Sequence, residues 1–346
     1  MPSDADGRAF LRAARRQPTP FTPVWLMLQA GRYLPEYRAL RARHGFLELC
    51  HDPAAAAEVT LQPVERLGVD AAILFADILL LVEPLGRGLE FVKGDGPRID
   101  RPVRSEADVR ALPPIDVEAS VGFVFETVRA ATRALGGRVP LIGFAGAPFT
   151  VASYLVEGGP SRDYLHTKRL MYGAPEAWRG LMTVLADATA RYLNGQIAAG
   201  ADAVQIFDSW IGVLGPEDYR AFVLPHMRAL ITAITPGAPV IHFGTGTPSL
   251  LRLMREAGGD VIGLDWRVDL DAGWDLVGHD VAVQGNLDPA VLLGPLPLIR
   301  DRARAILDRA GGRPGHIFNL GHGVHQDTPV DHVRALVDLV HELSAR

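Results

Sequence analysis

The stretch PVIHFGTGTPSLLRLMREAG (239–258) contains the unit from which the fold is built. It begins with a short apolar run, passes through a glycine-rich turn and ends in a helical pattern, with Pro248 in the first turn and Gly258 just past the end. The apolar run is continuous rather than alternating, which is typical of a parallel strand covered on both faces. The stretch therefore predicts a strand followed by a helix. Its turn, FGTGTPS (243–249), resembles a phosphate-binding loop, but we interpret it as a tight turn because a GxG pair alone is a weak signal.

The same unit recurs along the chain. Eight apolar runs predict parallel strands: PVWLM (23–27), AAILFA (71–76), VPLIGFAG (139–146), AVQIFD (203–208), PVIHFG (239–244), VIGLDW (261–266), VAVQGN (281–286) and HIFNLG (316–321). Most of the gaps hold helical patterns, at 53–68, 121–136, 175–200, 216–234, 248–258, 297–311 and 330–346. This alternation, without a dinucleotide-binding fingerprint, favours an α/β fold of the (β/α)8 TIM barrel type. An open doubly wound sheet is the alternative.

One segment departs from the simple alternation of strand and helix. Residues 77–139 are too many for one crossover helix, and GLEFVKGDGPRID (88–100) within them predicts a small hairpin that turns at 93–96. We expect this hairpin to be an insertion after the second strand. No proline- or serine-rich linker divides the chain, so we predict a single domain over residues 1–346.

Composition excludes several classes of protein. The formal net charge is −5 with acidic and basic residues interspersed, which argues against nucleic-acid binding. Cys50 is the only cysteine, so the chain alone can form neither a disulfide nor a CxxC site, and we interpret Cys50 as a packing residue. The start, MPSDADGRAF, lacks the parts of a signal peptide, and no run approaches the roughly 20 apolar residues of a membrane span. We expect a cytoplasmic protein without a membrane partner.

Functional groups of a (β/α)8 barrel lie where strands end, because the loops there converge on one open face. The ends of the predicted strands carry or precede Gln29, Arg32, Asp77, Tyr154, Asp208, Ser209, Asp265, Asn286, Asp288 and His322. Asp77 is the strongest signal, since AAILFADILLLV (71–82) places one carboxylate between apolar flanks, where an unpartnered charge is costly. Asp77 caps a turn, pairs with one arginine or accepts several N–H donors from a ligand.

Histidines near a barrel mouth raise the question of a metal. His322, between two glycines, is predicted to face the cavity, with a turn histidine satisfied by backbone groups as the alternative. We interpret His242 as a core or cavity-wall residue. No HxH, HExxH or Cys–His pair occurs at ligand spacing, so we predict no metal.

Seven blocks of the sequence resemble the uroporphyrinogen decarboxylase family in the same order. They are WLMLQAGRYLPEYR, AAILFADILL, LIGFAGAPFTVASYLVEGG, QIFDSWIG, VIGLDWRVDL, VQGNLDP and FNLGHGVHQDTP. The resemblance covers nearly the whole chain and implies a (β/α)8 barrel and a homodimer that acts as a lyase in haem and porphyrin biosynthesis. The reaction it implies converts uroporphyrinogen III to coproporphyrinogen III with loss of four acetate carboxyl groups as CO2 and without a cofactor.

The resemblance also implies roles for individual residues. Asp77 matches the family's central aspartate, whose carboxylate can accept the four pyrrole N–H groups of a porphyrinogen and stabilise a cationic pyrrole during decarboxylation. Arg32 and His322 match positions that bind substrate carboxylates, and with Asp77 and Tyr154 they are the predicted catalytic residues. The other predicted substrate-binding residues are Gln29, Ser209, Ile73, Phe75, Phe144 and Phe207. Arg41 is a candidate for a further cation, although a helix-face arginine with a surface partner is the preferred interpretation.

One position departs from the family pattern. Family members have Met-Arg-Gln-Ala-Gly-Arg-Tyr, and this chain has Leu28 in place of the first arginine. In the family, that arginine is proposed to orient a substrate carboxylate or to take part in proton delivery. Loss of such a contact costs about 2 to 5 kcal/mol, a factor of roughly 30 to several thousand in rate. We therefore expect impaired decarboxylation.

Two alternative functions stay open. An enzyme of the same fold with another substrate, such as a corrinoid methyltransferase, would need zinc held by His and Cys, and a chain whose only cysteine is Cys50 argues against it. A porphyrinogen-binding protein would keep Asp77 and Arg32 but would release no CO2.

Overall fold

The computed structural model describes residues 8–92 and 96–346 of the chain. Its centre is a curled sheet of seven parallel strands, each paired with its neighbour in the order β1-β4-β5-β6-β7-β8-β9. The strands are β1 (Ala72–Ile73), β4 (Leu141–Gly146), β5 (Ala203–Asp208), β6 (Val240–Gly244), β7 (Val261–Gly263), β8 (Ala282–Gln284) and β9 (His316–Ile317). Seven of the eight predicted apolar runs therefore contain strands of this sheet.

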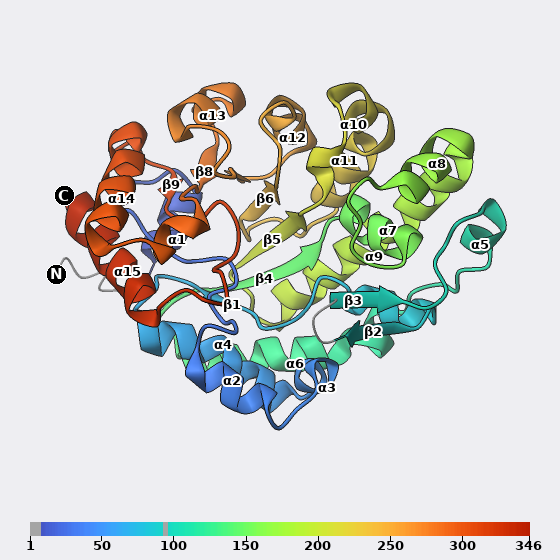
Figure 1. The fold of residues 1–346 in the computed structure, drawn as a ribbon, viewed down its shortest axis with the longest axis horizontal. Helices are drawn as coiled ribbons and strands as arrows, with labels where there is room; N and C mark the ends of the chain where they lie inside the picture. Colours follow the sequence, from blue (N-terminus) through green and yellow to red (C-terminus); the bar gives the residue numbers. More distant parts are fainter. Residues whose placement is uncertain (1–7, 93–95) are drawn as a thin grey trace.

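Helices surround the sheet on its outer side (Figure 1). The α-helices are α1 (Ala9–Ala14), α2 (Pro35–Arg41), α3 (Phe46–His51), α4 (Pro53–Leu67), α5 (Glu106–Arg110), α6 (Val117–Leu135), α7 (Pro148–Glu157), α8 (Leu165–Gly173), α9 (Pro175–Ala199), α10 (Pro216–Phe222), α11 (Leu224–Thr232), α12 (Leu251–Ala257), α13 (Leu270–Val277), α14 (Leu296–Ala310) and α15 (Val330–Ser344). Short 3-10 helices are η1 (Leu80–Leu85), η2 (Ile211–Val213) and η3 (Pro289–Leu293). Helix α4 shows why the predicted ends hold: the Asp52 side chain accepts two backbone N–H groups at its start, and Gly68 ends it at φ 72°.

The predicted helix over 216–234 is wrong as one element. The chain forms α10 and α11 instead, and Val223 between them has non-helical angles, φ −127° and ψ −49°. The cause is Pro225, which has no N–H to donate to the carbonyl four residues earlier and whose ring crowds that turn. A proline is tolerated in the first turn of a new helix, which is where Pro225 lies.

The first predicted strand, 23–27, is also wrong as a regular strand. Within this segment, Val24 forms an isolated parallel bridge with Phe318, which directly follows β9. The carbonyl of Val24 accepts a hydrogen bond from the N–H of Asp70 (2.8 Å), so the segment lies between β9 and the residues before β1. The chain then turns at Met27 and Leu28, because the N–H of Gln29 donates back to Leu26 (3.0 Å). The polar residues that follow are therefore carried by a turn and not by a strand end.

A second, separate sheet follows β1 in the chain. Strands β2 (Leu89–Val92) and β3 (Gly96–Ile99) pair antiparallel, with Leu89 opposite Ile99 and Val92 opposite Gly96. Most of the predicted turn at 93–96 lies outside the described residues. In Figure 1 these strands lie to one side of the curled sheet.

Side chains of alternate residues on β5 lie at a cavity and in a buried hydrogen-bond network. Phe207 lines a cavity, and Gln205, two residues earlier on the same face, is fully buried. The side-chain oxygen Oε1 of Gln205 accepts a hydrogen bond from Nε2 of Gln284 (3.0 Å), and Oε1 of Gln284 accepts one from the indole N–H of Trp25 (2.9 Å). These two hydrogen bonds connect β5, β8 and the segment 23–27.

Candidate active site

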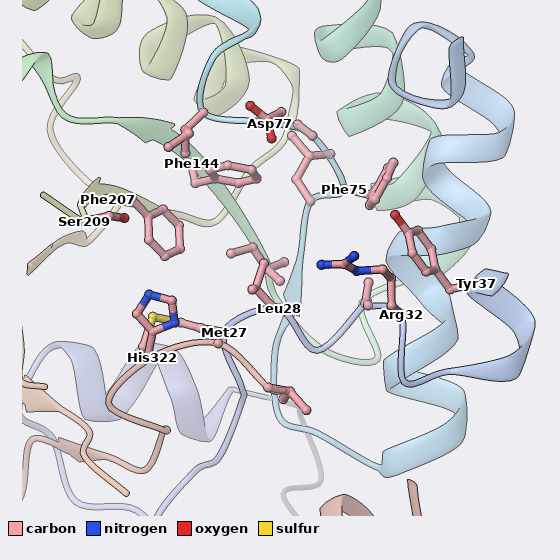
Figure 2. A pocket seen from close by; sticks show the side chains of 18 of the residues that line it. Met27, Leu28, Arg32, Tyr37, Phe75, Asp77, Phe144, Phe207, Ser209 and His322 are labelled. Atoms are coloured by element: carbon pink, nitrogen blue, oxygen red, sulfur yellow. The ribbon is translucent and has the colours of Figure 1, made fainter. Parts of the chain in front are cut away.

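A cavity of about 360 Å³ opens at the carboxyl ends of the strands. Its walls come from β1, β4, β5 and β6 and from the loops around residues 27–32 and 322–326. The lining residues are Met27, Leu28, Ala30, Gly31, Arg32, Tyr37, Phe46, Ile73, Leu74, Phe75, Ala76, Asp77, Ile78, Phe144, Phe207, Ser209, Phe243, His322, Gly323, Val324 and Gln326. Figure 2 shows side chains from elements far apart in sequence around one space.

Asp77 lies in this cavity among apolar side chains and is partly exposed to it. One carboxylate oxygen, Oδ1, accepts the N–H of Leu79 (2.8 Å), so Asp77 does cap the turn that leads into η1. Burial raises the pKa of Asp77 to about 7; the bond from Leu79 opposes this shift, and the charge of Glu83 adds to it. Among the described residues no side chain or backbone group donates to the second oxygen, Oδ2. Asp77 therefore caps a turn through Oδ1, and Oδ2 can still accept N–H groups of a ligand.

Arg32 lies on the loop between the Met27 turn and α2. Its side chain is exposed, and Figure 2 shows the guanidinium directed toward the cavity, beside Tyr37. The loop is held from α2, because Nη1 of Arg38 donates to the carbonyls of Arg32 and Tyr33, both at 2.9 Å. No carboxylate within the described ranges lies at ion-pair distance from Arg32, so its charge is available to an anionic ligand.

An outer groove of about 1120 Å³ adjoins the cavity and shares Arg32, Tyr37, Phe46 and Gln326 with it. It is also lined by Arg38, Arg41, Ala42, Phe91, Val92, Gly96 and Asp327. Arg41 stacks over Phe46, with its guanidinium carbon 5.5 Å from the ring centre, and donates to the His44 carbonyl (2.5 Å). Arg41 therefore has partners at the end of its own helix, as the helix-face interpretation expects, and it also lines this groove. Among the described residues that line the groove, three are arginines and one, Asp327, carries a carboxylate.

Leu28 points into the cavity between Arg32 and His322 (Figure 2). Its side chain is 60% exposed, and it adopts a left-handed backbone conformation at φ 57°. This conformation is unfavourable for a residue with a Cβ atom by roughly 1–2 kcal/mol. A Cβ on Gly323 would come within 2.2 Å of Leu28, so the absence of a side chain at Gly323 is what gives Leu28 its room.

Gln29 is a correction to the predicted substrate-binding set. It is fully buried, and it is not part of the cavity wall. Its amide oxygen accepts the N–H of Leu26 (3.0 Å), and its amide nitrogen donates to the carbonyl of Ala71 (3.1 Å). Gln29 therefore satisfies buried backbone groups of the turn and of the segment before β1, and none of its polar atoms is directed to a ligand.

Ser209 and His322 both lie in the cavity wall, as predicted. The His322 ring is edge-on to Trp266, with 6.4 Å between ring centres. Desolvation lowers the pKa of His322, the nearby charge of Arg267 lowers it further, and Asp265 opposes the shift. His322 is thus poised as a neutral hydrogen-bonding group at neutral pH.

Tyr154 on α7 is buried behind the cavity and is not part of its wall. Its ring is edge-on to Trp210, with 5.8 Å between ring centres. Burial raises the pKa of the Tyr154 hydroxyl to about 12, the Trp210 side chain beside it opposes this shift, and the charge of Asp77 adds to it. The hydroxyl is therefore protonated at neutral pH and lies within the electrostatic reach of Asp77.

The apolar residues predicted at this site all line the cavity: Ile73, Phe75, Phe144 and Phe207. Phe144 and Phe207 pack edge to face with 5.4 Å between ring centres. Strand-end reasoning missed Tyr37, Phe46 and the arginine Arg38, which come from the α2–α3 hairpin. The sequence signal for them was the charged and aromatic pattern YLPEYRALRARHGF (33–46), which reads equally well as an exposed helix.

Within residues 8–92 and 96–346, no group of three or more His, Cys, Asp and Glu side chains is placed to hold a metal ion. In the same ranges, none of the helices combines the length and the apolar character that crossing a bilayer requires. Cys50 is buried, and burial raises the pKa of its thiol well above the usual value.

Sequence comparison finds relatives over nearly the whole chain. The model of the family described as "Uroporphyrinogen decarboxylase (URO-D)" matches residues 6–343. The uroporphyrinogen decarboxylase of Carboxydothermus hydrogenoformans is 56% identical over 337 residues, which cover 97% of this chain and 96% of that protein. The protein of the same name from Sorangium cellulosum is 57% identical over 335 residues, 96% of each chain.

Solved structures resemble the fold at much lower identity. A methyltransferase from Methanosarcina mazei superposes with a TM-score of 0.82 at 20% identity, covering 96% of this chain and 97% of that one. A putative vitamin-B12-independent methionine synthase from Listeria monocytogenes gives 0.60 at 13% identity, covering 95% and 99% of the two chains. At such identities the likeness concerns the fold alone.

Proposed function

This chain belongs to the uroporphyrinogen decarboxylase family, and we propose that the cavity around Asp77 is where it performs that family's reaction. The chain is a carboxy-lyase that converts uroporphyrinogen III to coproporphyrinogen III. The observation that carries the placement of the reaction is Asp77 itself, a carboxylate with one uncommitted oxygen in a wall of apolar side chains. An apolar cavity with one converging polar group is the usual form of a small-molecule site.

The four pyrrole N–H groups of a porphyrinogen are donors that Asp77 lacks in the free protein. Burial raises the pKa of Asp77 to about 7 because it removes water from the carboxylate. When the pyrrole N–H groups donate to Asp77, they replace that water and favour the charged carboxylate over the neutral acid. In the reaction, a proton adds to the pyrrole α-carbon next to the ring carbon that bears the acetate and leaves a cationic pyrrole. The bond between the acetate methylene and its carboxylate then breaks, its electron pair enters the ring, and CO2 leaves. Asp77 stabilises the cation, and proton return to the methylene carbon with loss of the ring proton gives the methyl group.

The substrate's carboxylates call for cations around the apolar floor. Arg32 and His322 flank the inner cavity, with His322 as a neutral donor, and Ser209 adds a hydroxyl. A cavity of about 360 Å³ is near the low end of ligand pockets, which are about 300–1,000 Å³. The macrocycle therefore extends into the outer groove, where Arg38 and Arg41 face its outer carboxylates.

The fold around this site is proposed to be a (β/α)8 barrel, with the segment 23–25 as its first strand. The bridge of Val24 to Phe318 and its bond from Asp70 support closure between the two ends of the curled sheet. The antiparallel β2–β3 pair is then an insertion after the second barrel strand. From the family we also propose that the protein is cytoplasmic and forms a homodimer. Light scattering of the purified chain tests the homodimer.

Chromatography of the porphyrins formed from uroporphyrinogen III tests the proposed site. We expect coproporphyrin, together with partly decarboxylated intermediates if Leu28 slows the later steps, and we expect Asp77→Asn to abolish all of them. Substrate binding without any CO2 release would support the alternative of a binding protein. Full activity of Asp77→Asn would move the chemistry away from this cavity.

A further inference from the structure

The loop that carries His322 is fixed on both sides of this residue by backbone hydrogen bonds. The N–H of Gly321 donates to the Leu287 carbonyl (2.7 Å), and the N–H of Val324 donates to the Met27 carbonyl (2.9 Å). The imidazole itself is exposed to the cavity (Figure 2). Among the described residues no hydrogen-bond partner holds either of its ring nitrogens. Packing therefore sets the direction in which these nitrogens point.

The ring that packs against His322 is that of Trp266. The two ring centres are 6.4 Å apart, and the ring planes are nearly perpendicular, at 87°. Edge-to-face contacts of this kind favour one relative orientation of the two rings. A Cβ on Gly321 would collide with the backbone nitrogen of Trp266, so this glycine lets the His322 loop approach the segment after β7 closely. Trp266 is not among the residues that line the cavity, so it can act on a ligand there only through His322.

The indole of Trp266 is held in turn by an ion pair. The guanidinium of Arg267 lies over the indole, with 4.0 Å between its central carbon and the ring centre. Nη1 of Arg267 donates to Oδ2 of Asp265 (2.9 Å), and the backbone N–H of Arg267 donates to Oδ1 (2.9 Å). Asp265 is fully buried, and Nδ2 of Asn286 donates to its carbonyl (2.8 Å). The guanidinium therefore has a fixed anchor, and the indole contacts both this cation and the imidazole.

We propose that Trp266 is a positioning residue that holds the His322 imidazole in an orientation from which it donates an N–H to a carboxylate of the tetrapyrrole. Asp265 and Arg267 hold the indole in place. The inference rests on the proposed function, which assigns His322 to the substrate's carboxylates. It also gives a role to Asp265, a carboxylate near a strand end whose two oxygens are both bonded within the protein.

The size of the effect follows from the rotamers that the indole excludes. A histidine side chain has three staggered χ1 positions and two ring orientations, about six arrangements in all. If one of them binds the carboxylate, loss of the indole lowers the competent fraction to roughly a third to a sixth, and the apparent dissociation constant rises by the inverse of this fraction. Once bound, the carboxylate holds the imidazole itself. KM should therefore rise about 3- to 6-fold, while kcat changes less than about twofold.

A double-mutant cycle with His322 tests the inference. Trp266→Leu removes the aromatic ring and should raise KM for uroporphyrinogen III by about 3- to 6-fold. Trp266→Phe keeps an aromatic face and should restore KM to within about twofold of the wild-type value. In the His322→Ala background, Trp266→Leu should have no further effect within about twofold. Additive effects of Trp266→Leu and His322→Ala would overturn the inference, because a general loosening of the fold would then explain the loss.

The matched control for the ion pair is Arg313→Gln, compared with Arg267→Gln. Arg313 also stacks over a tryptophan, with 4.9 Å between its guanidinium carbon and the ring centre of Trp274, and neither residue lines the cavity. Arg267→Gln should raise KM in the same direction as Trp266→Leu and by a smaller factor, because the indole loses one of its two contacts. Arg313→Gln should leave KM unchanged. The same KM for both variants would contradict the part assigned to Arg267.

The order of the His322 ring in the free protein separates this inference from the proposed function. NMR relaxation of ring-labelled histidine reports that order, and the His322 signal is identified by its loss in His322→Ala. We expect a rigid ring in the wild type and a mobile ring in Trp266→Leu, whether or not the protein releases CO2. A ring that is equally rigid in both would overturn the inference. Absence of CO2 release with this difference intact would refute the proposed function alone.

Discussion

Replacement of Leu28 by arginine should accelerate this enzyme. The side chain at this position lies between Arg32 and His322 at the mouth of the cavity, where the substrate's carboxylates are expected. Leu28 is 60% exposed, so a longer side chain has room without overpacking the core. The backbone remains left-handed at φ 57° for either residue, so the substitution changes the head group and leaves the backbone strain as it is.

The magnitude follows from this exposure. A hydrogen bond to a charged group contributes about 1.5–3 kcal/mol, and a buried one more. Because solvent reaches Leu28, we adopt this range instead of the 2 to 5 kcal/mol expected for a closed cleft. At about 1.4 kcal/mol for each factor of ten, kcat/KM should rise roughly 10- to 150-fold.

The assay is the initial rate of coproporphyrinogen formation from uroporphyrinogen III, with the intermediates resolved by chromatography. Leu28→Gln is the control, since it adds length and polarity without charge, and it should recover little of the gain. Partly decarboxylated products should also decline in Leu28→Arg if the missing cation limits the later steps. Equal rates for the wild type and Leu28→Arg would remove Leu28 from the mechanism.

Three further predictions concern Asp77, Arg41 and Gln29. For Asp77 the folded pKa is about 7 against 3.8 in the unfolded chain, so the stability that this carboxyl contributes is full below pH 4 and is lost as the pH rises through 7. Asp77→Asn should therefore raise the free energy of unfolding at pH 8 by about 1 kcal/mol, a value discounted for the partial exposure of Asp77, and should leave it unchanged at pH 4. The same substitution should abolish turnover. Denaturant unfolding at both pH values measures the stability effect, and a loss of stability at pH 8 would contradict the prediction. Arg41→Gln should raise KM for uroporphyrinogen III about 3- to 10-fold with little change in kcat. The KM of the wild type should rise more steeply with salt concentration than the KM of the variant. An unchanged KM would exclude the groove from substrate binding. Gln29→Leu should lower the free energy of unfolding in urea by about 2–4 kcal/mol, because two buried backbone groups lose their partners. KM should stay unchanged. A raised KM in a stable variant would show that Gln29 belongs to the substrate site.

The barrel-like order of strands and helices could be predicted from local pattern. Continuous apolar runs such as 139–146 and 203–208 became β4 and β5 because burial on both faces requires apolar residues at every position. The cavity residues Asp77, Ser209 and His322 could be predicted because parallel strands bring their ends to one edge. The role of each of these residues came from the family resemblance and awaits the experiments above.

The errors of prediction share one physical cause, which is competition between local pattern and distant contacts. The run 23–27 has the composition of a strand, but its neighbours at Phe318 and Asp70 allow Val24 a single bridge before the chain turns. Gln29 follows an apolar run and seems directed to the mouth, yet the turn rotates it inward to Leu26 and Ala71. No pattern within the segment reports which way that turn faces.

The sequence by itself indicated the α/β class of the fold and a carboxylate, Asp77, between apolar flanks, since apolar periodicity and residue identity are local properties. Only the tertiary structure decided that Leu28 sits left-handed between Arg32 and His322, that Gln29 points away from the cavity, and that Arg38 and Arg41 join Arg32 in an outer groove. It alone brought Trp210 against Tyr154 and Thr150, residues more than fifty positions earlier. Such contacts depend on the register and curvature of the whole sheet, which no single segment of the chain encodes.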